Sequence, residues 1–321
     1  FMLAVDEMNR AGGLDGRKLV PLVRDNALNK EILLQAAEDL IDEKVRFVVG
    51  PMTSQMAVSI VPQMTAAEVP LISPTVSTNK LIGQDDYFFR VYYANSQASE
   101  AMSAHIRNQG LKKVVALYDT GNSAYTTDWL KIFKSHFIGE GRTVQTIPFH
   151  AASATSFYDL VESVSGEDPD ALLILANPID TAIICQQAMK LGMKIPKFAT
   201  GWSYSGKLIT YGGESVEGLI VVQSVDFTKE RGEVRSFLDA YRNVYFDDPA
   251  FPAAHAYDAT RLALRALQSE KKESGGGLKQ ALLNMEAFPG ILQDFSLDRY
   301  GDVINPPIYF MQVDEAVFQS L

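Results

Sequence analysis

The sequence predicts an α/β protein built as two doubly wound lobes, and three observations support this prediction. Short apolar runs alternate with amphipathic helical patterns over residues 1–225, which is typical of parallel sheets covered by helices. The chain has 321 residues, more than one lobe usually holds, and 47% of them are hydrophobic. Glycines follow several of the helical patterns and mark where those helices end.

The predicted strands are short runs of consecutive apolar residues, so both faces of each strand should be buried. They cover residues 18–24, 46–49, 70–73, 113–118, 144–149, 171–176, 197–201 and 219–225. Because helical segments separate these runs, the strands should pair in parallel.

The predicted helices carry apolar residues three and four positions apart. Those between the strands cover residues 30–43, 55–67, 96–108, 125–138, 156–165 and 180–191. Asn29 and Ser96 are expected N-caps, whereas Gly110, Gly139 and Gly192 should end the helices that precede them.

The chain changes character after residue 225. Three helices in near succession are predicted over 233–245, 252–268 and 278–284, and residues 295–321 are typical of a β-meander. At the other end, the chain opens directly in an amphipathic helix, so we expect an upstream segment in the native protein.

Composition and charge argue against several classes of protein. The formal net charge is -10 and the pI is about 5.0, so a nucleic-acid backbone is not the expected partner. No apolar run reaches the roughly 18 residues that span a bilayer. The single cysteine, Cys185, rules out an intrachain disulfide and has the setting of an apolar helix residue.

The most informative stretch covers residues 47–81. It contains a buried strand, a small-residue turn, a helix, a second strand and a hydroxyl-rich turn, so one sheet edge gathers hydroxyl groups and backbone amides. The first turn, with Met52, Thr53 and Ser54, opens a helix whose unsatisfied amides and dipole favour an anion such as a carboxylate. Alternatively, Thr53 or Ser54 serves as a plain N-cap, and the two roles are compatible.

Seven segments, in order along the chain, carry a resemblance to a known family. They are AVDEMNRAGGLDGRKLVPLVRDN at 4–26, VVGPMTS at 48–54, VPLISPTVST at 69–78, FFRVYYANSQASEAM at 88–102, ALYDTGNSAYTTDW at 116–129, AHAYDATRLALRAL at 254–267 and FSLDRYGDV at 295–303. Together they make the chain resemble the type I periplasmic binding proteins, in the branch of the leucine/isoleucine/valine-binding proteins of ABC importers.

The resemblance implies two Rossmann-like lobes joined by three crossover strands, with a ligand cleft between them. Lobe 1 would comprise residues 1–93 and 226–302, and lobe 2 residues 94–225 and 303–321. In the family, a first strand precedes the helix that opens this chain, and the sequence lacks it. We expect the native protein to contain that strand and a ligand-contacting loop, because its absence would leave unpaired strand edges in a core.

The resemblance also assigns ligand-binding residues in lobe 1. In the turn after the second strand, Thr75, Val76 and Ser77 would clamp the ligand carboxylate together with the first turn. A backbone group near Thr75 and the Ser77 hydroxyl would make the contacts, although serine and threonine in loops also act as ordinary turn formers.

In lobe 2, the resemblance places Tyr125 over the ligand at the start of a helix, with helix-start packing as the alternative. Asn177 follows a predicted strand, and ligands of parallel sheets bind at the carboxyl ends of strands, although Ala-Asn-Pro is also an ordinary turn.

The chain departs from the family pattern at Trp202. Where the branched-chain amino-acid binders bring an acidic residue to the ammonium group of the ligand, the segment FATGWSYSG offers Trp202 and Tyr204. A buried ammonium without a partner is costly. Either Asp226 takes that role or the ligand lacks an ammonium, and an indole suits a flat or apolar ligand body. The alternative role for Trp202 is packing in the core of lobe 2.

The sequence favours a binding protein over an enzyme. It contains no dinucleotide-binding, P-loop, nucleophile-elbow or zinc-protease motif. None of the four histidines is spaced as a metal ligand with another histidine or cysteine. We assign His105, His136 and His255 to packing or to the surface, and Asp258 to an internal hydrogen bond. No catalytic residue, cofactor or metal ion is expected.

The predicted function is that of an extracytoplasmic solute-binding protein of an ABC importer. It would capture a small carboxylate by hinge closure, either a branched-chain, aliphatic or aromatic amino acid or a related amine-free acid. The partners would be that ligand and membrane permease subunits, with no nucleic acid, and the chain would be a monomer. It would be periplasmic or extracellular, with lipid anchoring through the upstream segment left open. The alternatives are the ectodomain of a signalling receptor and an enzyme or cytoplasmic regulator with this fold.

Overall fold

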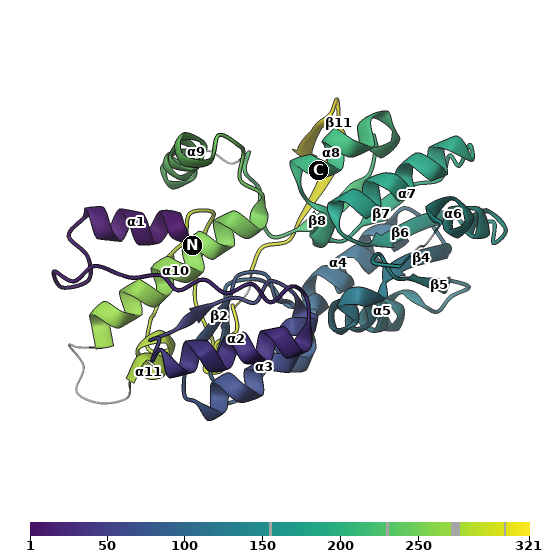
Figure 1. Cartoon of the computed structure of the whole chain (residues 1–321). Helices are drawn as coiled ribbons and strands as arrows, with labels where there is room; N and C mark the ends of the chain where they lie inside the picture. The colour runs from purple at the N-terminus through teal and green to yellow at the C-terminus, as the bar shows by residue number, and fades with distance from the viewer. Residues whose placement is uncertain (154–155, 229–230, 271–276, 305) are drawn as a thin grey trace. The chain divides into compact units, whose positions relative to one another are not determined.

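The computed structural model describes residues 1–153, 156–228, 231–270, 277–304 and 306–321 and confirms the α/β fold (Figure 1). The chain divides into two compact units. Unit 1 comprises Phe1–Ala94 and Glu230–Pro306, and unit 2 comprises Asn95–Lys229 and Pro307–Leu321.

Unit 1 is built on a parallel sheet in the order β1-β2-β3. The strands of unit 1 are β1 (Val48–Val49), β2 (Leu71–Ser73), β3 (Phe88–Arg90), β9 (Phe288–Pro289) and β10 (Asp294–Phe295). Strands β9 and β10 form a separate antiparallel pair. Its helices are α1 (Met2–Arg10), α2 (Lys30–Asp42), α3 (Ser54–Ala66), the 3-10 helix η1 (Asn79–Leu81), α9 (Gly232–Tyr245), α10 (Phe251–Glu270) and α11 (Gly277–Leu283).

Both faces of this sheet are covered because neighbouring strand residues point to opposite sides. Leu71 of β2 belongs to a core with Leu33 of α2 and Ile60 of α3. The next residue, Ile72, belongs to a second core with Leu262 of α10 and other residues of α10 and α11. The consecutive apolar residues of the predicted strand are therefore explained by two-sided burial.

Unit 2 holds a seven-stranded sheet in the order β12-β11-β8-β7-β6-β4-β5. Its strands are β4 (Lys113–Asp119), β5 (Thr143–Phe149), β6 (Ala171–Leu175), β7 (Lys197–Ala199), β8 (Ile220–Gln223), β11 (Tyr309–Asp314) and β12 (Val317–Ser320). The five strands from β8 to β5 pair in parallel, and the C-terminal hairpin of β11 and β12 adds to β8 in antiparallel orientation.

Helices cover both faces of the second sheet. They are α4 (Asn95–Asn108), α5 (Ser123–Phe137), α6 (Phe157–Ser165), α7 (Pro178–Lys190) and α8 (Gly206–Gly212), with the 3-10 helices η2 (Thr120–Asn122), η3 (Gly201–Ser203) and η4 (Gly213–Val216). Helices α4 and α5 lie on one side of the sheet and α7 and α8 on the other (Figure 1). This arrangement confirms the doubly wound prediction for this unit.

Most local signals act as the sequence predicts. The Asn29 side chain accepts a hydrogen bond from the amide of Ile32 and caps α2. Gly110 and Gly192 follow α4 and α7 with φ of 77° and 70°, a conformation that glycine adopts without strain. The prediction of Ser96 as an N-cap is wrong, because α4 already begins at Asn95.

Two strand predictions need correction. Residues 18–24 form no strand, and the side chains of Val20 and Val23 are 80% and 69% exposed. A strand requires a hydrogen-bonded partner, and no described segment pairs with these residues. Conversely, β3 was not predicted as a strand, although it pairs with β2 in parallel. The predicted C-terminal meander is confirmed only in its last part: β11 and β12 form a hairpin, whereas β10 pairs with β9 in a separate sheet.

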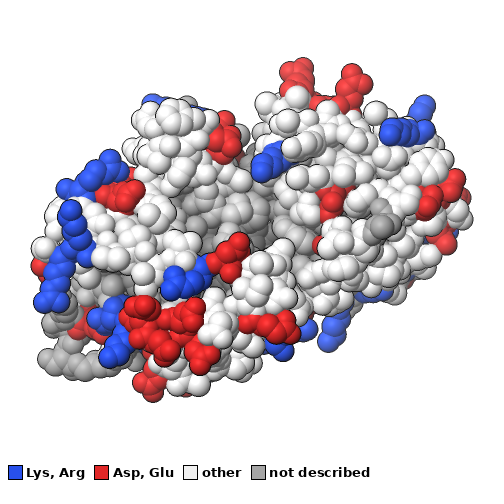
Figure 2. All heavy atoms as spheres, viewed as in Figure 1, with Lys and Arg blue, Asp and Glu red and all other residues white. Residues whose placement is uncertain are grey.

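Surface charge agrees with the acidic composition. On the face shown in Figure 2, Lys and Arg side chains are scattered in small groups among Asp and Glu side chains. Within the described ranges, no helix is both long and apolar enough to cross a membrane. Nor do these residues contain a group of three or more His, Cys, Asp or Glu side chains that could hold a metal ion.

Candidate functional site

Two turns of unit 1 lie at the same sheet edge. One follows β1 and leads into α3, and the other follows β2 and leads into η1. Because β1 and β2 are parallel, with Val49 opposite Ile72, both turns are at the carboxyl ends of neighbouring strands. The predicted residues of these turns, from Met52 to Ser54 and from Thr75 to Ser77, are thereby brought together.

Side-chain hydroxyl groups link the two turns. Ser73 Oγ donates to the carbonyl of Pro51 at 2.9 Å and accepts from the amide of Val76 at 3.1 Å. Thr75 Oγ1 donates to the carbonyl of Met52 at 2.6 Å. These bonds use Ser and Thr side chains to satisfy backbone groups that the turns leave without sheet partners.

A side chain of the first turn, that of Ser54, also binds the backbone of the second turn. Its side-chain oxygen accepts from the amides of Ser77 and Thr78 at 3.4 and 3.3 Å, and the residue is only 2% exposed. Since a hydroxyl group also has one hydrogen to donate, Ser54 retains a donor for an anion in this turn.

The structure distinguishes the roles of Thr53 and Ser54. Thr53 is the N-cap of α3, with its side chain accepting from the amide of Met56 at 3.5 Å. Ser54 opens the helix and binds the second turn instead. The positive end of the α3 dipole is therefore next to the hydroxyl groups of Ser54 and Ser77, an arrangement that favours negative charge.

A buried ion pair supports the second turn. Arg90, at the end of β3, donates from Nη1 to the carbonyl of Thr78 at 3.0 Å. Its Nε donates to Asp302 Oδ1 at 2.7 Å, and its side chain is 1% exposed. The guanidinium group thus joins the hydroxyl-rich turn to a residue of the segment 295–303.

Unit 2 brings two of the predicted aromatic residues into contact. Tyr125, in the first turn of α5, and Trp202, in η3, meet edge to face with ring centroids 5.7 Å apart. Trp202 is half-buried, so part of the indole remains accessible. The buried Asn95 side chain holds the start of α5 by donating to the carbonyl of Tyr125 at 3.2 Å.

The other predicted residues of unit 2 already have partners. Tyr204 packs on Phe318 of β12, and burial together with the nearby Asp226 raises the pKa of its hydroxyl group. Asp226 accepts from the amide and the hydroxyl of Thr228. Asn177 is the N-cap of α7, with Oδ1 accepting from the amides of Ile179 and Asp180.

Sequence reasoning missed the residues that position these groups, namely Ser73, Thr78, Arg90 and Asn95. Ser73 and Thr78 lie in the hydroxyl-rich turn after the second predicted strand of residues 47–81, so their residue type could have identified them. The pairing of Arg90 with Asp302 spans 212 residues, and nothing local indicates it.

Other titratable groups have the structural roles that were predicted. Asp258 is buried in α10 and accepts from the amide of Ile291, and burial raises its pKa to about 7. Burial raises the pKa of the Cys185 thiol to about 12, as expected for an apolar helix residue. His255 is buried against the ring of Tyr92, and His105 stacks on Phe310.

Comparisons with known proteins agree with this architecture. A model of the periplasmic binding protein family matches residues 1–317. A Leu/Ile/Val-binding protein homolog of Brucella melitensis is 21% identical, with 99% of this chain and 86% of that protein covered.

Among solved structures, the branched-chain amino acid transporter substrate binding protein of Streptococcus pneumoniae, in complex with isoleucine, is 28% identical with a TM-score of 0.89. The match covers 99% of this chain and 90% of that one. A solute binding protein of an ABC transporter from R. palustris, in complex with benzoate, is 19% identical with a TM-score of 0.87, over 100% of this chain and 88% of that one. The resemblance found in the sequence is therefore confirmed: this chain belongs to the periplasmic binding protein family.

Proposed function

We propose that the chain is the extracytoplasmic solute-binding protein of an ABC importer and that it captures a small carboxylate. The observation that carries the proposal is the hydroxyl cluster of unit 1, formed by Ser54, Thr75 and Ser77 at the positive end of α3. A carboxylate accepts hydrogen bonds from hydroxyl and amide donors and is stabilised by the helix dipole.

The contacts within the cluster support preorganisation. Thr75 and Ser54 hold the two turns together through bonds of 2.6 to 3.4 Å, so a ligand would not have to order them. Ser77 is 2% exposed, and its hydroxyl makes no hydrogen bond within the described parts of the chain. That hydroxyl is the donor we assign to the ligand.

The aromatic pair of unit 2 would contact the body of the ligand. Tyr125 and Trp202 present an edge-to-face arrangement that suits an apolar or aromatic group. The loop that carries Trp202 has no acidic side chain between Thr200 and Ser205, and Asp226 is engaged by Thr228. We therefore retain both ligand classes, amino acids and amine-free acids. A Streptococcus pneumoniae relative is described in complex with isoleucine and an R. palustris relative in complex with benzoate.

A thermal-shift screen tests the ligand class. The purified chain would be heated with leucine, isoleucine, phenylalanine, benzoate, 4-hydroxybenzoate and aliphatic acids, and with glucose, putrescine and Zn²⁺ as non-carboxylate controls. At about 100 times Kd a ligand stabilises by about 2.7 kcal/mol, which raises Tm measurably. A shift with acids alone supports the proposal, whereas shifts only with the controls contradict it.

Uptake measurements test the importer role. Membrane vesicles that contain candidate ABC permease subunits from the same organism would be supplied with the chain and a radiolabelled ligand from the screen. We expect ATP-dependent accumulation that requires the chain. If the ligand binds but no permease subunit transports it, the sensor alternative replaces the importer.

A further inference from the structure

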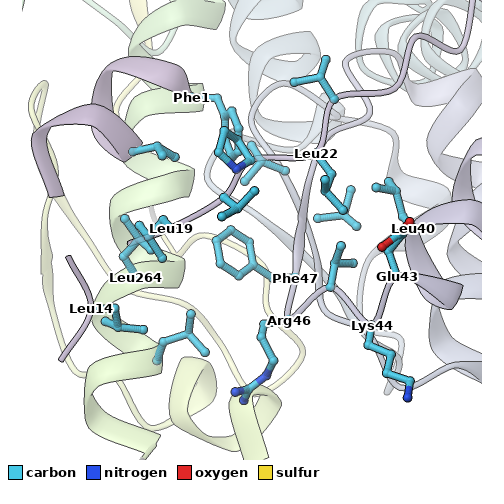
Figure 3. A pocket seen from close by; sticks show the side chains of 18 of the residues that line it. Phe1, Leu14, Leu19, Leu22, Leu40, Glu43, Lys44, Arg46, Phe47 and Leu264 are labelled. Atoms are coloured by element: carbon cyan, nitrogen blue, oxygen red, sulfur yellow. The ribbon is translucent and has the colours of Figure 1, made fainter. Parts of the chain in front are cut away.

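Unit 1 contains two hollows with apolar linings. One is a cavity of about 800 Å³ whose lining includes Leu19, Phe47 and Leu264 (Figure 3). These side chains pack in the core around α10, so this cavity belongs to the interior packing of the unit. The other is an open groove of about 480 Å³ between α1 and α9 (Figure 1). Because this groove is on the surface, it can receive a side chain of another molecule.

Apolar side chains from both helices line the groove. Leu3 comes from α1, and Ala240 and Val244, one turn apart, come from α9. Leu3 is buried, whereas the Val244 side chain is exposed. An apolar side chain that entered the groove would therefore remove further apolar surface from water.

The charged residues of the groove leave one cation available. Glu7 is engaged, because it accepts a hydrogen bond from the Tyr257 hydroxyl group. Arg10 donates from Nε to the carbonyl of Asp6 at 3.3 Å and forms no ion pair within the part of the chain that the structure describes. An exposed guanidinium group beside an apolar groove favours a partner that brings a carboxylate together with an apolar group.

Phe246, directly after α9, is the most exposed large hydrophobic residue described, with 91% of its surface accessible. Its φ of 55° is a left-handed conformation that a phenylalanine adopts with strain. Its amide still donates to the carbonyl of Arg242 at 2.9 Å and ends the helix. The ring therefore projects from the end of α9, as an aromatic anchor of a protein interface does.

A row of aromatic rings leads along α9 to this end. Phe237 is buried, and its ring centroid lies 5.8 Å from that of Tyr241. The ring of Tyr241 lies 4.6 Å from that of Tyr245, whose side chain is exposed. The apolar surface thus continues from the core of unit 1 to Phe246, and contiguous exposed apolar surface of this kind marks an interaction site.

The charge next to Phe246 is opposite to that of the groove. Asp248 pairs with Arg242 at 2.6 Å. Asp247 accepts from the amide of Asp248 and has no ion pair among the described residues. The anchor therefore carries an available carboxylate, and this carboxylate argues against an anionic membrane surface or a nucleic acid as the partner.

Groove and anchor match each other on the same helix. The groove is apolar and carries a cation without an ion pair, whereas the anchor is aromatic and adjoins a carboxylate without an ion pair. Phe246 does not fill the groove of its own chain, since its ring is exposed. A surface that contains both halves of a complementary pair can bind a second copy of itself around a two-fold axis, with each half used twice.

We propose that the chain forms a two-fold symmetric dimer through α9. Phe246 of one copy enters the groove between α1 and α9 of the second copy, and Asp247 of one copy pairs with Arg10 of the second. This dimer would replace the monomer expected from the sequence. The inference rests on residues of unit 1 alone and is independent of the proposed ligand and importer role.

Sedimentation velocity of the whole chain tests the dimer. Over about 1 to 500 μM, a range in which a weak interface associates, we expect the mass to rise from 35.4 kDa towards twice that value. Phe246→Ala should raise the Kd of the dimer at least about tenfold. Leu28→Ala is the matched control and should leave the Kd unchanged, because Leu28 is also exposed with positive φ but does not line the groove.

A charge exchange tests the contact between copies. Arg10→Glu and Asp247→Lys each bring like charges together, so each variant alone should raise the Kd at least about tenfold. An equimolar mixture of the two should restore association to within about threefold, because both pairs in the mixed dimer again join opposite charges. These side chains are exposed, so the variants should keep the Tm of the unchanged chain.

Three results would overturn the proposal. The first is a chain that stays monomeric over the whole concentration range. The second is a mixture that associates no better than its two components, which would place the dimer on another face. The third is an unchanged chain that stays monomeric while Phe246→Ala lowers uptake in the vesicle assay without changing ligand affinity. In that case the surface receives a permease subunit instead of a second copy.

Discussion

Arg90 and Asp302 form an ion pair in unit 1 in which Nε and Nη2 of the guanidinium group lie 2.7 and 2.6 Å from the same carboxylate oxygen. The pair connects two segments, 88–102 and 295–303, that carry the family resemblance. Through Nη1 of Arg90 it also fixes the carbonyl of Thr78, next to the proposed carboxylate donor Ser77. The residues that support the candidate site are thus farther apart in the sequence than the residues that form it.

Asp302→Asn should lower the free energy of unfolding by about 3 kcal/mol, because it leaves the charge of buried Arg90 without its partner. Chemical denaturation measures this. Glu270→Gln is the matched control, since it breaks the Arg46–Glu270 pair, in which the Arg46 side chain is 57% exposed. The control should cost less than about 1 kcal/mol. Equal effects of the two variants would show that the Arg90 pair has no special role.

Ser54→Ala and Ser77→Ala should differ in what they affect. The first variant removes the acceptor of two buried amides, so it should weaken both folding stability and ligand binding, each by about 1 to 3 kcal/mol. The second should weaken binding by a similar amount while Tm stays close to that of the unchanged chain. Ser59→Ala, in the same helix, is the control, because Ser59 Oγ only donates to the carbonyl of Gln55. If ligand affinity is unchanged in both variants, these serines serve only to form the turns and do not bind the ligand.

Trp202→Ala should weaken binding of an aromatic acid more than binding of leucine, because the indole offers a flat face and Tyr125 fixes its edge. We expect a loss of about 1 to 2 kcal/mol for the aromatic ligand, and a smaller loss for Trp202→Phe. Titration calorimetry measures both. Tyr211→Ala is the control for loss of an exposed aromatic side chain. Equal affinity of Trp202→Ala and the unchanged chain would assign the indole to packing in unit 2.

His255 should make the fold sensitive to acid. Burial lowers its pKa to about 3, so between pH 6.5 and pH 3 the unfolded chain binds a proton that the folded chain excludes. Stability should therefore fall as pH decreases through this window, by an amount on the order of 2 kcal/mol between pH 7 and pH 4.5. Urea unfolding of His255→Phe at both pH values should show a smaller decrease than the unchanged chain.

Asp258 should change the pH dependence of stability in the direction opposite to that of His255. Burial raises its pKa to about 7, so its contribution is present below about pH 4 and is lost as pH rises towards 7. Asp258→Asn keeps an acceptor for the amide of Ile291 and should remove this loss. If the pH dependence of unfolding is the same in the His255 and Asp258 variants, neither side chain governs it.

The sequence predicts most of the fold because its helices and turns are specified locally. Thr53 was one of two candidate caps for α3, and the hydroxyl-rich turn was predicted from its composition. The same local signals cannot decide pairing. Residues 18–24 have the composition of a strand, but a strand also needs a partner, and none is present in the described structure.

The candidate site is predicted only in part for the same reason. Ser54 and Ser77 were identified as polar groups near one sheet edge, whereas their link through a hydroxyl–amide bond depends on the register of β1 and β2. The contact between Tyr125 and Trp202 joins two helices that are far apart in the sequence. These relationships are set by tertiary packing, which residue types alone do not predict.

The central claim is that the hydroxyl cluster of unit 1 binds a carboxylate. Titration calorimetry with acid and amide pairs tests it most directly: leucine against leucinamide, and benzoate against benzamide. Whichever acid binds, its amide should bind at least about tenfold more weakly, because hydrogen bonds to a charged group contribute about 1.5 to 3 kcal/mol. An amide that binds as tightly as its acid would contradict the claim.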